Sequence, residues 1–238
     1  MNSKTHVLFM MGGSGTRFGS NLPKQFVRIN NTPIFIFPLL KYEKMDTISS
    51  ITIACNKLFV EDTIQYCKDY NLTKVKVVTK GGDTRSESVK NGLAEIKRFA
   101  DGEDVILIHD ATHPFVDIDC TNRLIKEIEA CGAGSLVNFI FDTAYIKDEN
   151  DFLVETIDRK KLAVGASPEG FLFKYLDNIY SNTPKEQLEM MTSAGALALH
   201  FGIKMKVIEI NLLNLKITYP RDMELYQLLI DYYIKEKE

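Results

Sequence analysis

The sequence predicts an α/β fold: a Rossmann-like, mostly parallel sheet with helices on both faces. Over the first 141 residues, short apolar or β-branched runs alternate with segments that have the 3.6-residue spacing of amphipathic helices. This alternation is typical of βαβ units, which place successive strands parallel in one sheet. Ligands of such sheets bind beyond the carboxyl ends of the strands. We therefore expect the functional site in the loops that follow the strands.

Each element can be assigned from local sequence in order. The predicted strands cover residues 7–11, 50–55, 75–78, 104–110 and 135–141. The predicted helices begin at Pro33, whose fixed φ suits a first turn, and then cover residues 61–70, 86–99 and 119–131. Gly132 stops the last of these helices.

The regular alternation ends after residue 141. Residues 142–166 alternate apolar and polar side chains around the turn sequence Asp148-Glu149-Asn150-Asp151, which predicts an inserted β-hairpin arm. A projecting hairpin has little core of its own, so we expect it to pack on a second copy of the chain. Helices at 170–180 and 192–201, a strand at 206–210 and a helix from Asp222 follow. No linker or repeat divides the chain, so residues 1–238 are expected to form a single domain.

The charge distribution limits the classes of partner that we expect. The formal charge of −3 over 238 residues argues against a nucleic-acid-binding tail or a polybasic membrane anchor, and no apolar run approaches the roughly 20 residues of a membrane span. We therefore expect neither a nucleic-acid nor a membrane partner. Residues 1–42 nevertheless contain five basic residues and no Asp or Glu. A local anion site explains this gap, and so does chance.

The cysteines indicate a reducing compartment. Cys55, Cys67, Cys120 and Cys131 form no CxxC pair and have no paired histidines, so zinc binding is not expected. A chain of this length forms a core without disulfides. We therefore interpret the four as reduced thiols of a cytoplasmic protein.

The first candidate site is the glycine-rich segment after the first strand. It reads Gly12-Gly13-Ser14-Gly15-Thr16-Arg17, with Pro23-Lys24 shortly after it. Glycines let backbone N–H groups approach an oxyanion, and Arg17 and Lys24 add positive charge with no acid nearby, which favours a triphosphate site. The segment lacks the Gly-Lys-[Ser/Thr] of a Walker A loop and the third glycine of the dinucleotide fingerprint. The alternative is a left-handed turn between strand and helix.

Three further segments carry residues suited to nucleotide chemistry. They are Gly81-Gly82-Asp83-Thr84-Arg85-Ser86-Glu87-Ser88, His109-Asp110-Ala111-Thr112-His113-Pro114 and Asn214-Leu215-Lys216-Ile217-Thr218. The first can read a base edge, although Asp83 or Ser86 can equally serve as a helix cap. Asp110 can hold Mg²⁺ against phosphates or simply end a strand. Lys216 can bind an anion or lie exposed on an edge strand.

These segments, in this order, resemble the cytidylyltransferase family that includes 4-diphosphocytidyl-2-C-methylerythritol synthase and ribitol-5-phosphate cytidylyltransferase. The family pattern is GGxGxR…PKQ, GGxxRxxSV, HDAxRP, DT…TxxR, [ST]PxxF and NxKIT…D. The remaining matches are Gln25 after Lys24, Val89 after Ser88, Asp142-Thr143 with Thr156 and Arg159, Ser167-Pro168 with Phe171, and Asp222. The resemblance extends over essentially the whole chain.

The resemblance implies a fold of the nucleotide-diphospho-sugar transferase type, CTP and Mg²⁺ as ligands, and a homodimer formed through the arm. An acceptor phosphate would attack the α-phosphorus of CTP, and pyrophosphate would leave. The implied catalytic residues are Arg17, Lys24 and Lys216. The implied CTP contacts are Met11, Gly12, Gly13, Ser14, Gly15, Thr16, Gly81, Gly82, Asp83, Arg85, Ser88, Asp110 and Ala111, with Asp110 also holding the metal. The implied acceptor contacts are Thr143, His113, Ser167 and Arg159, the last reaching over from the arm of the second copy.

The sequence departs from the family pattern mainly around the acceptor. His113 replaces the arginine of HDAxRP, and Ala144 replaces an expected lysine. Glu169 replaces the glutamine of TPQ, and an acidic pair has become Ser193-Ala194. We expect CTP to be retained and the acceptor to differ, which favours a small polyol phosphate such as glycerol or ribitol phosphate, used for capsule or cell-wall polymers.

Three other functions remain open at this point. The acceptor can be 2-C-methyl-D-erythritol 4-phosphate, as in isoprenoid synthesis. The altered motifs also fit a catalytically silent nucleotide-binding regulatory protein. A sugar-1-phosphate transferase that uses UTP or GTP shares the logic of the glycine loop, although the GGxxRxxSV segment resembles the cytidine reader.

Overall fold

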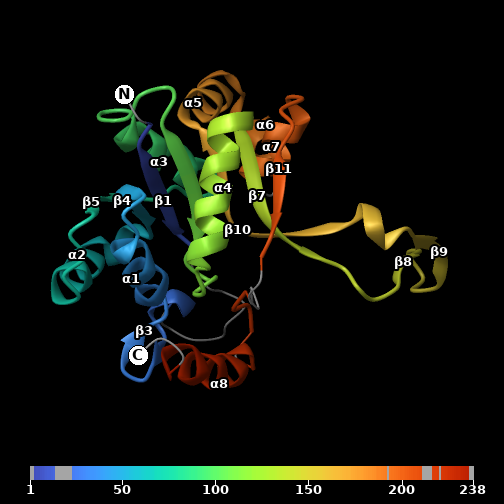
Figure 1. The fold of residues 1–238 in the computed structure, drawn as a ribbon, viewed down its shortest axis with the longest axis horizontal. Coiled ribbons are helices and arrows are strands. Elements are labelled where there is room, and N and C mark those ends of the chain that lie inside the picture. Colours follow the sequence, from blue (N-terminus) through green and yellow to red (C-terminus); the bar gives the residue numbers. More distant parts are fainter. Residues whose placement is uncertain (1–2, 14–22, 192, 211–215, 220, 236–238) are drawn as a thin grey trace.

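A seven-stranded sheet forms the centre of the protein (Figure 1). The computed structural model describes residues 3–13, 23–191, 193–210, 216–219 and 221–235. In spatial order the strands are β11 (Lys206–Glu209), β7 (Ala133–Phe139), β10 (Ala163–Leu172), β6 (Val105–Asp110), β1 (Thr5–Met11), β4 (Ile48–Cys55) and β5 (Val75–Lys80). β10 pairs antiparallel with β6 and β7, and the other neighbours pair in parallel. The predicted α/β class with a mostly parallel sheet is confirmed.

Helices cover both faces of the sheet, as β1 shows residue by residue. Val7, Phe9 and Met11 pack with α1 (Ile36–Lys44), α2 (Val60–Asp69) and α4 (Ile118–Cys131). Leu8 and Met10 point the other way, toward α3 (Arg85–Ile96), α5 (Phe173–Asn182), α6 (Lys185–Met190) and α7 (Ala194–His200). Successive side chains of a strand face opposite sides, so a strand buried on both faces reads as a continuous apolar run.

A smaller hydrophobic cluster lies near the carboxyl ends of the parallel strands. The hairpin of β2 (Arg28–Ile29) and β3 (Thr32–Pro33) packs there against α8 (Asp222–Lys235) (Figure 1). Asn30 and Asn31 have φ of 47° and 64°, as a two-residue hairpin turn requires. Short 3₁₀ segments at Lys24–Phe26, Lys57–Phe59 and Arg159–Lys161 complete the described elements.

The inserted hairpin arm predicted from the sequence is present. β8 (Ala144–Lys147) and β9 (Leu153–Ile157) pair antiparallel at the end of an arm that projects from the body (Figure 1). Its exposed large apolar side chains are Phe141, Tyr145, Ile146, Phe152, Leu153 and Val154.

The return from the arm corrects one expected boundary. Residues 163–172 are strand β10 in the middle of the sheet, and the helix expected from 170 begins at Phe173. Gly170 lets β10 pack closely against α4, because a Cβ at this position would lie 2.4 Å from Ile128 Cδ1. The helix expected over 192–201 is shorter, at Ala194–His200, and the one expected from Pro33 begins at Ile36. Among the described helices, none has the length and apolar character to cross a membrane.

Candidate active site

The loops after four parallel strands enclose a cavity of about 510 Å³. Residues after β1, β4, β5 and β6 meet there because the carboxyl ends of parallel strands share one edge of the sheet. The described lining consists of Met10, Met11, Gly12, Gly13, Lys24, Gln25, Asn56, Lys57, Gly81, Gly82, Asp83, Thr84, Arg85, Ser88, Asp110, Ala111, Thr112 and Lys216. The cavity therefore gathers segments that are far apart in the chain.

Most of the expected CTP contacts lie in this lining, as do Lys24 and Lys216. Ser14, Gly15, Thr16 and Arg17 fall outside the described residues. The individual roles of these residues stay predictions.

Gln25 ties the start of the glycine segment to the body of the protein. Its Nε2 donates to Met11 O at 2.9 Å and to Gly13 O at 3.0 Å, and the side chain is buried. These bonds satisfy the carbonyls of the last residue of β1 and of Gly13 in the segment that follows it. Gln25 belongs to the PKQ part of the family pattern, but its role as a brace could not be read from sequence.

Ser88 explains why glycines stand at the start of the loop after β1 (Gly12) and of the loop after β5 (Gly81). Its Oγ accepts from Gly82 N at 2.9 Å and donates to Thr84 O at 2.9 Å. A Cβ would lie 2.8 Å from this Oγ at Gly81 and 3.0 Å at Gly12. Both loops thus close tightly on the same hydroxyl, and side chains there would push them apart. The structure gives Ser88 a role in holding the loop that carries the expected base contacts.

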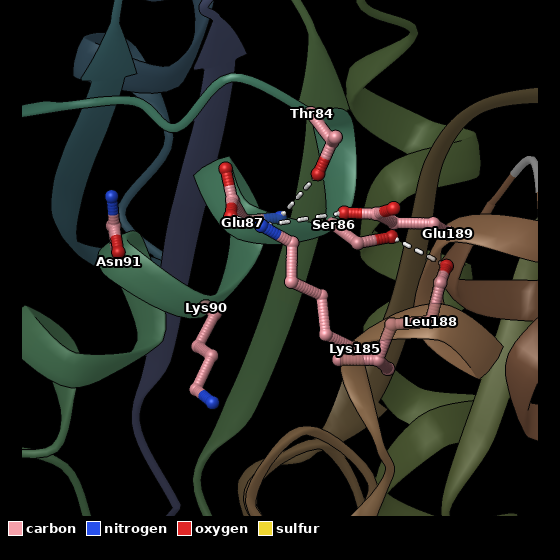
Figure 2. Close-up of a pocket in the computed structure, with 8 residues that line it drawn as sticks. All are labelled: Thr84, Ser86, Glu87, Lys90, Asn91, Lys185, Leu188 and Glu189. Carbon is pink, nitrogen blue, oxygen red and sulfur yellow. Dashed lines mark hydrogen bonds and ion pairs between the residues drawn. The ribbon is translucent and has the colours of Figure 1, made fainter.

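The first turn of α3 is fixed from both sides. Thr84 caps the helix by accepting from Glu87 N, and Glu87 Oε2 accepts from Asp83 N at 2.8 Å. Glu87 also pairs with Lys185 at 2.5 Å, and Ser86 Oγ donates to Leu188 O at 2.8 Å (Figure 2). Thr84 is thus the N-cap, rather than Asp83 or Ser86 as weighed from sequence.

The groove behind this turn, between α3 and α6, is a separate feature. Its volume is about 370 Å³, and Lys90, Lys185, Glu87 and Glu189 contribute charges of both signs (Figure 2). Glu87 of α3 already pairs with Lys185 of α6, so the contacts in this groove mainly hold α3 in place. The first turn of α3 carries Arg85, which lines the cavity.

Asp110 is one of two acidic residues in the described lining of the cavity, the other being Asp83. Asp110 Oδ1 lies 3.2 Å from Arg85 Nη2, and Asp110 Oδ2 lies 3.4 Å from Lys216 Nζ. Burial alone would raise the pKa of Asp110, but the positive charges of Arg85 and Lys216 lower it to about 2. The carboxylate is therefore ionised at any physiological pH.

Ser167 supports Asp110 instead of lining the cavity. Its buried Oγ accepts from Asp110 N at 3.1 Å. Ser167 thus fixes the backbone of a strand end, and nothing in one chain places it beside an acceptor.

The two histidines near Asp110 are buried and neutral. His109 stacks on Phe9, its Nδ1 lies 2.8 Å from the Tyr42 hydroxyl, and its Nε2 donates to His113 O at 2.7 Å. Burial lowers the pKa of His109 to about 4 and that of His113 to about 3. His113 therefore cannot supply the positive charge of the arginine that it replaces in the family pattern.

Two of the three lysines in the described lining, Lys24 and Lys216, are connected through one segment. Lys24 Nζ donates to Ile217 O at 2.8 Å, and Ile217 N donates to Thr112 O at 2.9 Å. These two bonds hold the segment that carries Lys216 against Lys24 and against the loop that follows β6. The described lining contains four cationic side chains (Lys24, Lys57, Arg85 and Lys216) and two carboxylates (Asp83 and Asp110), and this excess of positive charge suits the binding of a polyphosphate.

Thr143 and Arg159 are not brought to this cavity by their own chain. Thr143 is exposed at the start of the arm, and Arg159 donates from Nη1 to Phe141 O, also on the arm. Their expected role depends on a second copy and stays a prediction.

Six lining residues had no role assigned from sequence: Met10, Gln25, Asn56, Lys57, Thr84 and Thr112. Asn56 and Lys57 directly follow β4, so the rule that sites lie beyond strand ends could have identified them.

Asp110 fits a divalent cation only as part of a shared site. Among the residues that the structure describes, no group of three or more His, Cys, Asp or Glu side chains is placed to hold a metal. Mg²⁺ commonly takes one or two carboxylates and completes its coordination with substrate phosphates and water. One ionised carboxylate beside a cavity of polyphosphate size meets that requirement.

Comparisons with known proteins agree with this geometry. The profile of the family described as "IspD: 2-C-methyl-D-erythritol 4-phosphate cytidylyltransferase" matches residues 5–231. The 2-C-methyl-D-erythritol 4-phosphate cytidylyltransferase of Clostridium botulinum (strain 657 / Type Ba4) is 30% identical over 96% of this chain and 98% of its own. The ribitol-5-phosphate cytidylyltransferase of Vibrio parahaemolyticus serotype O3:K6 is 27% identical over 94% of each chain.

A solved structure gives the same result. The Francisella tularensis 2-C-methyl-D-erythritol 4-phosphate cytidylyltransferase superposes with a TM-score of 0.77 at 27% identity, over 95% of this chain and 99% of that one. The fold and the resemblance stated from the motifs are both confirmed. The chain belongs to the IspD family of cytidylyltransferases and is a CTP-dependent nucleotidyltransferase.

Proposed function

We propose that the protein transfers CMP from CTP to a small polyol phosphate, such as glycerol or ribitol phosphate. The products are a CDP-polyol and pyrophosphate, used for capsule or cell-wall polymers. It acts as one domain of residues 1–238 in the cytoplasm, where its free thiols stay reduced.

One contrast carries the proposal. On the nucleotide side, Gln25, Ser88 and Asp110 hold the family's loops around the cavity. On the acceptor side, the arginine of the family pattern is the neutral, buried His113, and an expected lysine is Ala144. CTP use is therefore expected to persist while acceptor recognition differs from the methylerythritol pattern. The matching relative named ribitol-5-phosphate cytidylyltransferase supports a polyol acceptor.

The reaction needs positioning and charge neutralisation rather than a nucleophilic side chain. An ionised acceptor phosphate already carries the attacking oxygen, which forms a bond to the α-phosphorus of CTP while the bond to pyrophosphate breaks. Lys24 and Lys216 hold the phosphates and offset the charge on the α-phosphate and the leaving group. N–H groups of the glycine segment align the triphosphate for in-line attack.

Asp110 has two tasks in this scheme. It holds Lys216 at the cavity edge, and it would hold Mg²⁺ when the nucleotide binds. Mg²⁺ bound there would neutralise part of the triphosphate charge.

The arm is proposed to join two copies of the chain. Its exposed apolar side chains include Phe141, Phe152 and Leu153, and burying them against a second copy removes them from water. Arg159 and Thr143 of each arm then reach the acceptor side of the other copy.

Methylerythritol phosphate is the second candidate acceptor, because the family description and the relative from Clostridium botulinum carry that name. A panel of glycerol 3-phosphate, ribitol 5-phosphate and 2-C-methyl-D-erythritol 4-phosphate, each with CTP, distinguishes the two. We expect kcat/KM for one polyol phosphate to exceed that for the methylerythritol compound by about tenfold or more. The reverse order would establish the second candidate. CTP-induced thermal stabilisation without turnover on any acceptor would indicate the silent regulatory protein.

A further inference from the structure

Glu169 is a largely buried carboxylate next to the cavity, and the proposed reaction does not use it. It lies on β10 and is paired with Ile108 of β6. Ile108 comes two residues before Asp110 in β6. Its side chain is 12% exposed, and it is not part of the described cavity lining. A carboxylate in such a place is costly unless its charge is answered.

Three donors converge on this carboxylate. Ala194 N donates to Oε1 at 3.1 Å, and Gly195 N donates to Oε2 at 2.8 Å. Arg85 Nη2 lies 3.4 Å from Oε1. A Cβ at Gly195 would lie 2.8 Å from Oε2, so the carboxylate sits closely against a residue that has no side chain.

The same Arg85 nitrogen also contacts Asp110. Nη2 lies 3.2 Å from Asp110 Oδ1 and 3.4 Å from Glu169 Oε1, so one guanidinium bridges the two carboxylates. Without Glu169, Asp110 would be the main anion left to Arg85. The guanidinium would then draw Asp110 away from Lys216 and from the nucleotide. Glu169 thus balances the pull of Asp110 on Arg85.

Two departures from the family pattern meet at this contact. Glu169 stands where the pattern has glutamine, and Ala194 stands at the second position of its acidic pair. Ala194 N is itself one of the donors to Glu169. A negative charge lost from the start of α7 is thus present on the neighbouring strand.

We propose that Glu169 is a positioning residue: it holds the guanidinium of Arg85 between β10 and Asp110, and so keeps Asp110 available to CTP. It supplies from β10 the charge that the family pattern carries at position 194. This inference rests on the proposed use of CTP and not on the identity of the acceptor.

The test compares E169Q, R85Q, the double variant E169Q/R85Q and the exchange variant E169Q/A194D. Dissociation constants for CTP, kcat and KM are measured, and melting temperatures are recorded for each. Glu209→Gln is the control, because it removes an exposed carboxylate from β11. Wild-type turnover with CTP is established first, so that failure of the reaction itself is separated from failure of this inference.

We expect E169Q to weaken CTP binding and to lower kcat/KM for CTP by about tenfold, with KM for the acceptor little changed. In the R85Q background the same change should cost less than about twofold, because the cation that Glu169 holds is gone. R85Q removes the cation that E169Q leaves paired with Asp110 alone, so the double variant keeps the cycle measurable if E169Q is unstable. E169Q/A194D should regain several-fold in kcat/KM. CTP parameters of E169Q within twofold of wild type, or equal losses in both backgrounds, would overturn the proposal.

Discussion

Lys216 Nζ lies 3.4 Å from Asp110 Oδ2, although the two residues are 106 positions apart in the chain. The contact joins the end of β6 to the segment before α8 at the rim of the cavity. It holds a cation in place before any phosphate arrives, so the site is largely arranged in advance. Preorganised charge of this kind lowers the barrier of a phosphate-transfer reaction without rearrangement in the reacting complex.

Lys216→Ala should lower kcat by about 100-fold or more with little change in melting temperature, because the lysine offsets charge that develops on the phosphates. Lys24→Ala should behave similarly. Steady-state kinetics with CTP measures both, and Lys68→Ala, an exposed position on α2, is the matched control. Activity of either cavity variant within a few-fold of wild type would remove that lysine from the mechanism.

Gly81→Ala should raise KM for CTP by about tenfold. The new Cβ would lie 2.8 Å from Ser88 Oγ and 3.2 Å from Cys55 O, so the loop has to move away from the cavity. Gly102→Ala is the control, since its Cβ would meet only Lys174 Cβ at 3.5 Å, an ordinary contact. An unchanged KM in Gly81→Ala would show that the loop does not contact the nucleotide.

Asp110→Asn should lower kcat by about 100-fold and shift the Mg²⁺ dependence of the rate to higher concentration. The reason is that the amide cannot replace the charged ligand, and it leaves Arg85 and Lys216 without their shared anion. Rates are measured over a Mg²⁺ titration after treatment with chelator. The same half-saturating Mg²⁺ in variant and wild type would contradict the metal assignment.

The buried histidines should make the protein less stable as pH falls. The pKa of His113 is about 3 in the folded protein against 6.5 for an unperturbed histidine, so the unfolded chain takes up the proton first. Each such histidine lowers the free energy of unfolding by up to about 1.4 kcal/mol per pH unit between these two values. His113→Asn should make the decline between pH 6 and 4 shallower in urea unfolding, with His200→Asn as control. An unchanged slope would show that His113 is not kept neutral by burial.

Two inactive variants should restore activity when mixed, if the arms reach across a dimer. In a mixed dimer of Lys216→Ala and Arg159→Ala chains, one site has an intact Lys216 and receives an intact Arg159 from the other copy. Random exchange then gives about a quarter of wild-type activity. No recovery after confirmed exchange of subunits would mean that Arg159 does not serve the other copy.

The strands and helices that could be predicted are those with strong local patterns. β1 and β6 contain continuous apolar runs, β4 is rich in β-branched residues, and the apolar residues of α3 and α4 recur at helical spacing. β10 lacked such a signal, because its sequence contains Gly165, Pro168 and Gly170, which weaken a strand. Its place in the sheet depends on pairing with β6 and β7, which local sequence does not contain. The β2–β3 hairpin did leave a signal that was missed, the Asn30-Asn31 pair at its turn.

The site divides in the same way. Glycines and charged residues at strand ends could be identified, because strand ends of one sheet meet at one edge. The bracing contacts could not, since Gln25 acts on the carbonyls of Met11 and Gly13, and Glu169 of β10 acts on Arg85 of α3. These contacts join segments whose spacing in sequence carries no pattern.

The fate of the α-phosphate tests the central claim most directly. The enzyme is incubated with Mg²⁺, the acceptor phosphate and CTP labelled at the α-phosphate, and the products are identified by mass spectrometry. We predict that the label appears in a CDP-alcohol, with one pyrophosphate released for each labelled product and none released without acceptor. Label recovered only in CTP or in free CMP would contradict cytidylyl transfer at this site.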